Sequence, residues 1–240
     1  MRALVPLKEF SAAKQRLAGL LSPVERAHLF QAMVVDVLEV LCAQPQLGPV
    51  TLCSRDPAAT WLASHFGIEF RAETELGASG LNGVVNAAAA HFRAAGEEEL
   101  LVVHGDLPLL GELDLELLLQ AHHAHTGPAV TLAPDQLRQG TNLLAWRQLP
   151  VFRTEYGPNS FQRHCAQAQR LGAELTVCAL PGGRCDIDEP ADLLALVAED
   201  NEGRAGNTLK FLHESGLARR LRAMLQGAGQ PPLGERYGRL

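Results

Sequence analysis

The chain has 240 residues, of which 47% are hydrophobic and 20% are charged, as in an ordinary globular protein. That length allows one large α/β domain with an appendage, or two small domains. Its five cysteines include no CxxC pair, which argues against a zinc site and favours a reducing, cytoplasmic setting. No apolar run approaches the ~20 residues of a membrane span, and the N-terminal sequence lacks a signal-peptide apolar region. We therefore expect no membrane association.

The net charge of −6 is unevenly distributed. Residues 201–240 hold seven Lys/Arg and three Asp/Glu, a net charge of +4, so the first 200 residues carry −10. An acidic body disfavours nucleic acid as the main partner. An anionic substrate would therefore need locally placed cations or a metal ion.

Strands and helices alternate through residue 199, as judged from hydrophobic periodicity and capping signals. Strands are predicted at residues 2–7, 50–54, 68–71, from 100 to near Pro108, and at 129–133, 143–146 and 174–180. Helices are predicted at 23–43, 57–66, 84–95, 113–125, 161–171, 191–199 and 208–225. This alternation predicts a parallel or mostly parallel sheet with helices on both faces.

One acidic residue follows the most apolar stretch of the chain. The segment LLVVHGDLPLL, residues 100–110, suits a strand buried on both faces of a parallel sheet. Asp106 should then lie just past the carboxyl end of a central strand, where open α/β sheets bind ligands. A lone Asp in a turn or at a helix cap is the commoner case, so other parts of the chain must support a functional role.

Cations gather after the first predicted strand, where Lys8, Lys14 and Arg16 lie among small residues. Such a loop could form a phosphate cradle. Neither GxxxxGK[ST] nor GxGxxG is present. Lys and Arg on a solvated helix face remain the commoner explanation.

Further polar groups lie next to predicted helices. The glycine-rich segment ETELGASGLNG, residues 73–83, allows close backbone approach to a ligand, and Asn82 could pair with a base edge or merely cap a helix. Ser160 precedes a helix whose free N–H groups form an anion site. Asp186 and Asp188 share one face of an extended segment, where two carboxylates need a cation between them unless one is protonated. Alternatively, Asp188 caps the last helix.

These residues favour phosphate chemistry. Asp106, Asp186 and Asp188 could together bind Mg²⁺ and leave positions for phosphate oxygens. Lys8 and Lys14 could neutralise a triphosphate. No convincing Ser/His/Asp set or reactive Cys is present, so we predict phosphoryl or nucleotidyl transfer, in which catalysis is mostly positioning and charge neutralisation.

A series of motifs resembles a known family over about residues 1–198. In order, they are VPLKEFSAAKQRLAGLLSPVER, GLN before an Ala-rich helix, GDLPLL, APD followed by GTN, YGPNSFQRH and DIDEPADL. Together they closely resemble the 2-phospho-L-lactate (or phosphoenolpyruvate) guanylyltransferases of deazaflavin coenzyme F-420 biosynthesis. The resemblance implies a compact relative of the molybdenum-cofactor guanylyltransferase fold in residues 1–200. This fold is a Rossmann-like, mostly parallel (mixed) sheet of the nucleotide-diphospho-sugar transferase type.

The resemblance also implies a reaction and a set of roles. GTP would donate GMP to the phosphate of a three-carbon phospho-acid, and pyrophosphate would leave. Phosphoenolpyruvate is the favoured acid, with 2-phospho-L-lactate and 3-phosphoglycerate as alternatives. Carried over to this sequence, Mg²⁺ would be held by Asp106, Asp186 and Asp188, with Asp106 also counted as catalytic. The triphosphate would face Lys8 and Lys14, the guanine would lie by Gly80 and Asn82, and the acid would be held by Thr141, Gly157 and Ser160.

Two other functions stay open. A sugar- or molybdopterin-type nucleotidyltransferase usually opens with a glycine-rich loop ending in Arg and Lys, which Pro6-Leu7-Lys8 replaces here. A non-catalytic regulator that binds GTP or a phosphometabolite would not need three carboxylates.

Several features lie outside the family pattern or carry no assigned role. His104 stands where a small or apolar residue is expected. His122, His123 and His125 are expected to be exposed at a helix C-terminus, where positive charge is favoured. The basic extension, residues 201–240, is expected to be helical and to pack on the body. Alternatively, the extension forms a homodimer contact, or it docks the next F-420 pathway transferase so that the product is handed on.

Overall fold

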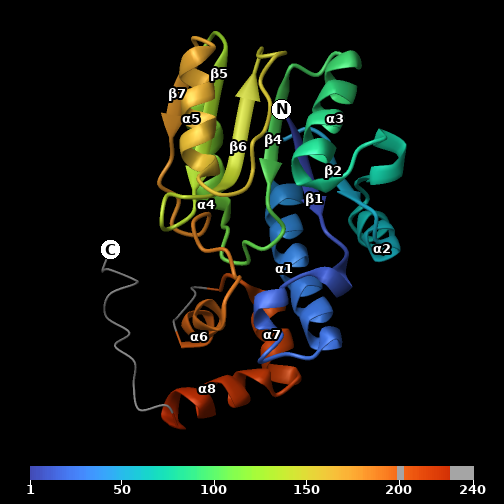
Figure 1. Ribbon diagram of the computed structural model, residues 1–240, viewed down its shortest axis with the longest axis vertical. Helices are drawn as coiled ribbons and strands as arrows, with labels where there is room; N and C mark the ends of the chain where they lie inside the picture. The colour runs from blue at the N-terminus through green and yellow to red at the C-terminus, as the bar shows by residue number, and fades with distance from the viewer. Residues whose placement is uncertain (199–202, 228–240) are drawn as a thin grey trace.

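The computed structural model describes residues 1–198 and 203–227, which are built around a seven-stranded sheet of order β3-β2-β1-β4-β6-β5-β7 (Figure 1). The strands are β1 (Arg2–Leu7), β2 (Val50–Ser54), β3 (Glu69–Ala72), β4 (Glu99–Val103), β5 (Ala129–Pro134), β6 (Thr141–Arg147) and β7 (Glu174–Val177). The helices are α1 (Pro23–Ala43), α2 (Pro57–Phe66), α3 (Gly80–Ala94), α4 (Glu112–His123), α5 (Ser160–Arg170), α6 (Pro190–Ala198), α7 (Gly206–Glu214) and α8 (Leu217–Gly227). In the described sheet only β6 runs antiparallel to its neighbours, so the predicted mostly parallel, mixed sheet is confirmed.

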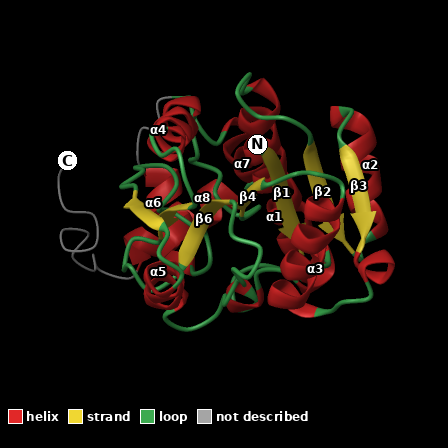
Figure 2. Ribbon diagram, turned by 90° about the horizontal axis from the view of Figure 1, so that it is seen from above, coloured by secondary structure: helices red, strands yellow, loops and turns green. Residues whose placement is uncertain are grey.

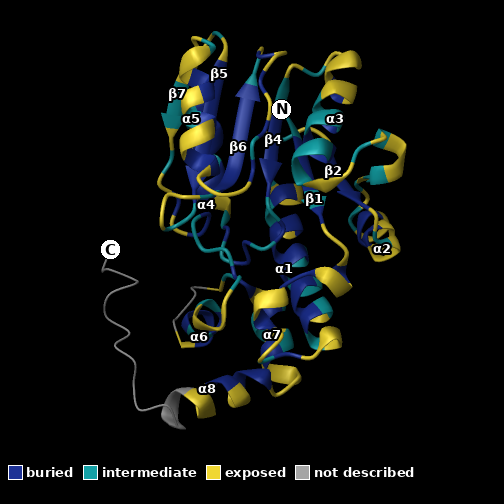
Figure 3. Cartoon of the chain, in the orientation of Figure 1, coloured by how far each residue is buried: buried dark blue, intermediate teal, exposed yellow. Residues whose placement is uncertain are grey.

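Helices cover both faces of the sheet. Helices α1, α2 and α4 lie on one face, and α3 and α5 lie on the other (Figure 2). Their apolar side chains form one buried cluster with each face of the sheet. The central strands are almost wholly buried, whereas the outward sides of α2 and α5 are exposed (Figure 3). This double coverage explains why the central strands are continuous apolar runs.

The chain reverses its direction across the sheet between β1 and β4. Along the chain, β2 and then β3 are added on one side of β1, and β4 is then added on the other side of β1. Ligands in open α/β sheets bind at such a switch point, beyond the carboxyl ends of the strands. The loops after β1 and β4 are therefore the ones that position a site.

A third apolar cluster lies beyond this edge of the sheet, where α6, α7 and α8 pack with the first half of α1 (Figure 1). The N-terminus of α7 is held by Asp36 of α1. Its carboxylate accepts hydrogen bonds from the backbone N–H groups of Asn207 (2.8 Å) and Thr208 (3.0 Å). The described part of the C-terminal extension is thus tied to the body of the protein.

Some predicted boundaries were wrong. The strand expected to reach Pro108 ends at Val103. The His104 N–H still donates to the Asn142 carbonyl of β6, and the chain then turns at Gly105 and Asp106. Helix α3 begins at Gly80 rather than near Val84, which places Asn82 in its first turn. The single helix expected over 208–225 is two helices, interrupted at Gly216, whose φ of +73° is incompatible with a continuous α-helix.

The prediction that His122 is exposed was also wrong. Its ring is fully buried between α4 and β5, and Nδ1 lies 3.0 Å from Thr131 Oγ1. Burial lowers the pKa of His122 to about 4, so the ring is neutral at pH 7. Among the described residues, none of the helices combines the length and apolar character needed to span a bilayer.

Candidate active site

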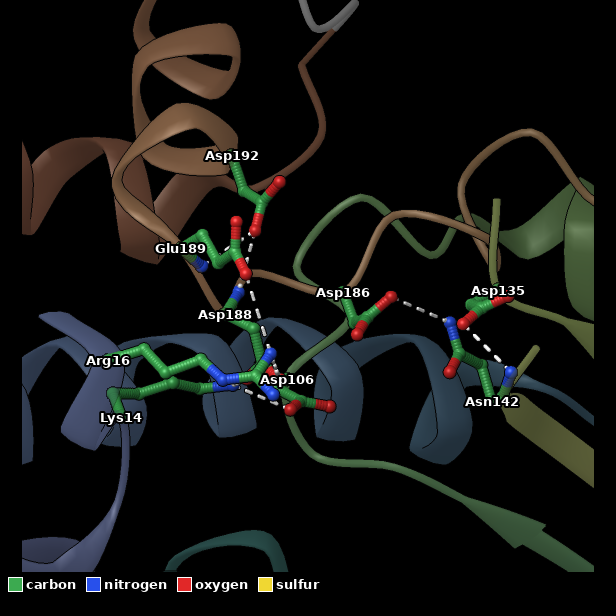
Figure 4. A network of polar contacts seen from close by, with 10 residues as sticks. Lys14, Arg16, Asp106, Asp135, Asn142, Asp186, Asp188, Glu189 and Asp192 are labelled. Carbon is green, nitrogen blue, oxygen red and sulfur yellow. Dashed lines mark hydrogen bonds and ion pairs between the residues drawn. The ribbon is translucent and has the colours of Figure 1, made fainter. Parts of the chain in front are cut away.

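A lysine and two aspartates meet at the switch point of the sheet. Lys14 Nζ, from the loop after β1, lies 2.6 Å from Asp106 Oδ2 and 2.8 Å from Asp188 Oδ1 (Figure 4). The Lys14 side chain is only 4% exposed, and its backbone φ of +52° is unusual for a residue with a side chain. The fold thus brings together three of the predicted residues from loops far apart in the sequence.

The electrostatics of this cluster favour the charged forms. Burial acts to lower the pKa of Lys14, but the charges of Asp106 and Asp188 outweigh burial and raise it. Burial likewise acts to raise the pKa of Asp106, and the charge of Lys14 overcomes it, so the pKa is lowered. At pH 7 Lys14 is therefore an ammonium group and Asp106 is a carboxylate.

Two further charged groups border this cluster at its open side. Arg16 is 68% exposed and lies 3.8 Å from Asp188 and 3.6 Å from Glu189. Lys8 is exposed in the loop after β1. The pKa of the neighbouring His104 is lowered mainly by burial, and the charge of Lys8 adds slightly to this effect. Exposed cations of the loop after β1 are therefore available near the carboxylates, as an anionic substrate would require.

Asp186 occupies a separate position. Its Oδ1 accepts a hydrogen bond from Asn142 Nδ2 at 3.3 Å (Figure 4). The same amide group donates to the Gly183 carbonyl (3.2 Å). Burial first, and then the charge of Asp106, raise the pKa of Asp186 to about 6. Sequence reasoning did not single out Asn142, although it lies in the GTN motif next to Thr141.

The carboxylate oxygens of Asp106, Asp186 and Asp188 have the chemistry that a hard divalent cation prefers. Oδ1 of Asp106 is buried and has no hydrogen-bond partner in the described residues. The pKa of Asp186 is raised by burial first and then by the charge of Asp106, and a cation would relieve that second effect. Oxygen donors of this kind suit Mg²⁺. Within the described ranges, however, no three His, Cys, Asp or Glu side chains are grouped closely enough to form a metal site. The set Asp106, Asp186 and Asp188 therefore stays a prediction.

His104 lies beside the same cluster. Its ring is 5.0 Å from that of Tyr156, and its Nε2 is buried with no partner in the described part of the chain. Burial lowers the pKa of His104, although the charge of Asp106 opposes this, so the ring is neutral at pH 7.

The residues predicted to bind the acid also come together. Thr141 begins β6, Ser160 begins α5, and their hydroxyl oxygens lie 3.5 Å apart. Gly157, in the turn before α5, has a φ of +123°, which glycine adopts without strain. Both hydroxyl-bearing residues are buried, and Thr141 Oγ1 lies 3.0 Å from Nδ1 of His164. His164 was missed, although it follows Ser160 by one helical turn on the same face.

The predicted guanine-side residues lie at the N-terminus of α3. Gly80 has a φ of +70° and opens the helix. Asn82 does not cap it. Instead, its Oδ1 accepts from the Tyr156 N–H (2.6 Å) and its Nδ2 donates to the Tyr156 carbonyl (2.9 Å). The Asn82 amide therefore joins α3 to the segment that precedes Gly157.

Solved structures share this fold. One described as a nucleotide-diphospho-sugar transferase from Desulfovibrio desulfuricans covers 92% of this chain and 97% of its own, with a TM-score of 0.71 and 16% identity. A CMP:2-keto-3-deoxy-manno-octonic acid synthetase complexed with CTP covers 81% and 95%, with a TM-score of 0.51 and 15% identity. At these identities the likeness establishes the architecture alone.

Sequence relatives are more informative. A phosphoenolpyruvate guanylyltransferase of Roseiflexus castenholzii is 39% identical over 197 residues, which is 82% of this chain and 88% of the relative. A 2-phospho-L-lactate guanylyltransferase of Methanothrix thermoacetophila is 35% identical over 207 residues, 85% of this chain and 87% of the relative. The family model for guanylyl transferase CofC like proteins matches residues 1–220, so the match continues past residue 198 into α8. These findings show that the chain belongs to the guanylyl transferase CofC like family and is a nucleotidyltransferase of the guanylyltransferase type.

Proposed function

We propose that the protein transfers GMP from GTP to the phosphate of phosphoenolpyruvate, in deazaflavin coenzyme F-420 biosynthesis. The observation that carries the proposal is the Lys14–Asp106–Asp188 cluster at the switch point of the sheet. Asp186, two positions before Asp188, is joined through Asn142 and its β6 neighbour Thr141 to the buried hydroxyl groups at the start of α5. One half of the site thus suits a nucleoside triphosphate and the other a small anionic acid.

The reaction makes modest demands on the protein. A phosphate oxygen of the acid attacks the α-phosphorus of GTP, an O–P bond forms, and the bond to the β-phosphate oxygen breaks to release pyrophosphate. The attacking phosphate is already anionic at neutral pH, so no general base is required. Lys8 and Lys14 neutralise the triphosphate as negative charge accumulates on the leaving group.

Mg²⁺ is the proposed cofactor, held by carboxylate oxygens of Asp106, Asp186 and Asp188. When bound, it would supply additional positive charge to the phosphate oxygens. The residues of the chain provide the remaining functions. Gly80 and Asn82 lie on the guanine side, and Thr141, Gly157 and Ser160 form the acid side.

Phosphoenolpyruvate is preferred as the acid because the relative at 39% identity carries that name, whereas 2-phospho-L-lactate appears in the name of the relative at 35%. These acids differ by little more than a double bond, so a change in few contacts could exchange them. A cytoplasmic location, hand-off to the next pathway transferase, and a homodimer stay predictions of the sequence.

The test is pyrophosphate release with GTP and Mg²⁺, with phosphoenolpyruvate, 2-phospho-L-lactate and 3-phosphoglycerate offered separately and ATP and CTP as controls. We expect release with GTP and phosphoenolpyruvate. A further set of reactions offers a sugar phosphate or molybdopterin, and release with one of these alone would favour the other nucleotidyltransferase class. GTP binding without release under any condition, including addition of the next pathway enzyme, would favour a regulator.

A further inference from the structure

A short extended segment between β6 and α5 has its backbone held by side chains instead of by a sheet or helix. This segment, residues 153–156, is called the strap below. Each of its four backbone N–H groups donates to a side chain of α3 or α5. The pairs are Arg153 with Gln167 Oε1 (2.6 Å), Thr154 with Asn86 Oδ1 (2.8 Å), Glu155 with His164 Nε2 (2.8 Å) and Tyr156 with Asn82 Oδ1 (2.6 Å). Because each of the four backbone N–H groups has a side-chain acceptor, the strap is held in place without pairing to a neighbouring strand.

Two asparagines of α3 hold one side of the strap. Asn82 and Asn86 are one helical turn apart. Each accepts a hydrogen bond from the N–H of one strap residue and also donates one to the carbonyl of that same residue. Asn82 Nδ2 lies 2.9 Å from the Tyr156 carbonyl oxygen, and Asn86 Nδ2 lies 3.4 Å from that of Thr154. Four residues of helix rise about 6 Å, and two residues of extended chain span nearly the same length. The spacing of the asparagines therefore matches alternate residues of the strap.

Two residues of α5 hold the other side. His164 and Gln167 lie on one face of that helix, and both are buried. Because a backbone N–H can only donate, His164 Nε2 must be the acceptor from Glu155. The proton of the neutral ring is therefore on Nδ1, where it donates to Thr141 Oγ1 (3.0 Å). His164 thus connects the strap with the start of β6.

We propose that Asn82, Asn86 and His164 are positioning residues for the acceptor acid, which they serve by fixing the strap that leads directly into the turn at Gly157 and Ser160. The inference rests on the proposed function for the identity of the acid. This role differs from the one predicted from the sequence, in which Asn82 lies by the guanine. The Asn82 amide makes two hydrogen bonds to Tyr156 of the strap, and these bonds are present whichever ligand lies beside the N-terminus of α3. The strap also links the helix on the nucleotide side to the helix on the acid side.

The sharpest test replaces each asparagine by its isostere. In Asn82→Asp and Asn86→Asp the carboxylate still accepts the strap N–H but sets a second oxygen against the strap carbonyl, so the strap should loosen while the helix remains. Gln162→Glu is the matched control, since Gln162 Nε2 donates to the Arg138 carbonyl outside the strap. A third variant, His164→Gln, keeps an acceptor within reach of Glu155 and covers the case in which an asparagine variant fails to fold.

Hydrogen exchange gives a readout that does not depend on activity. In the wild-type protein the amides of residues 153–156 should exchange slowly, although they lie in neither helix nor strand. Exchange should accelerate at least about tenfold in the asparagine variants and remain at the wild-type rate in Gln162→Glu. Unchanged strap exchange in both asparagine variants would overturn the inference.

Steady-state kinetics then separate positioning from base recognition. We expect the KM for phosphoenolpyruvate to rise about tenfold in Asn86→Asp and Asn82→Asp, as for the loss of one hydrogen bond, with the dissociation constant of GTP within about twofold of the wild-type value. The alternative is that Asn82 reads the base. In that case the KM for GTP would rise, the preference for GTP over ITP would fall, and the KM for the acid would stay unchanged. If the wild-type protein releases no pyrophosphate with any acid, the proposed function has failed, and the exchange experiment still decides whether the strap is held as described.

Discussion

The Lys14 ammonium group lies 2.6 Å from Oδ2 of Asp106, although 92 positions separate the two residues in the chain. The same nitrogen lies 2.8 Å from Oδ1 of Asp188, 174 positions away. The contact holds both carboxylates in place, and in the proposed reaction Lys14 is the cation that neutralises the charge of the triphosphate. Charges fixed in advance are the main way in which a protein accelerates phosphoryl and nucleotidyl transfer.

Asp106→Asn should reduce pyrophosphate release at least about 100-fold, because a carboxylate at the centre of the cluster is replaced by a neutral amide. Thermal unfolding should show an intact fold. The control is Asp192→Asn, since Asp192 accepts only from the N–H groups of Asp188 and Glu189 at the start of α6 among its described contacts. Near-normal turnover in Asp106→Asn would show that the metal assignment is wrong.

Thr141→Val should raise the KM for the acid about tenfold while GTP binding is retained, because it removes a hydroxyl group and leaves the Nδ1–H of His164 without an acceptor. Thr131→Val is the matched control. Thr131 is also fully buried and lies 3.0 Å from Nδ1 of a buried histidine, His122. Both variants should lose about 1–2 kcal/mol of stability, but only Thr141→Val should raise the KM for the acid. A similar rise in Thr131→Val would show that the change in KM reflects general destabilisation.

The stability of the protein should depend on pH through His164. Burial lowers the pKa of His164 to about 4 from an ordinary value of 6.5. Between these values the unfolded chain binds more protons than the folded protein, so stability present above pH 6.5 is lost as the pH falls toward 4. The full contribution is about 3 kcal/mol.

The measurement is the free energy of unfolding in urea at several pH values. His164→Asn should show a smaller decrease between pH 6.5 and 4 than the wild-type protein. His123→Asn, at a half-exposed position on α4, should retain the wild-type decrease. An equally steep decrease in His164→Asn would mean that His164 is not held neutral in the folded state.

Asp36→Ala should detach the start of α7 from α1 and cost about 2 kcal/mol, because the carboxylate accepts from two backbone N–H groups and from the Thr208 hydroxyl. Denaturant unfolding with hydrogen exchange of residues 206–214 would measure both effects. Glu39→Ala is the comparison, since exposed Glu39 accepts only from the Asn207 side chain among its described contacts. Equal losses in the two variants would argue against Asp36 as the residue that fixes α7.

Much of the fold could be predicted because its signals are local. The Ser22 capping box, with reciprocal hydrogen bonds to Glu25, starts α1 where the sequence predicted it. The apolar run before His104 became the buried strand β4, and Asp106 lies past its carboxyl end at the switch point. Capping and periodicity depend on residues only a few positions apart, so a single sequence displays them.

What the sequence by itself determined was therefore the alternation of strands and helices, the order of the motifs, and the acidic and basic residues that follow β1 and β4. Only the tertiary structure decided that Lys14 lies between Asp106 and Asp188, that Asp186 turns instead to Asn142, and that Asn82 holds the backbone of Tyr156. These contacts join segments tens of residues or more apart. Their partners are fixed by how the helices dock on the sheet, and local sequence patterns carry no record of that geometry.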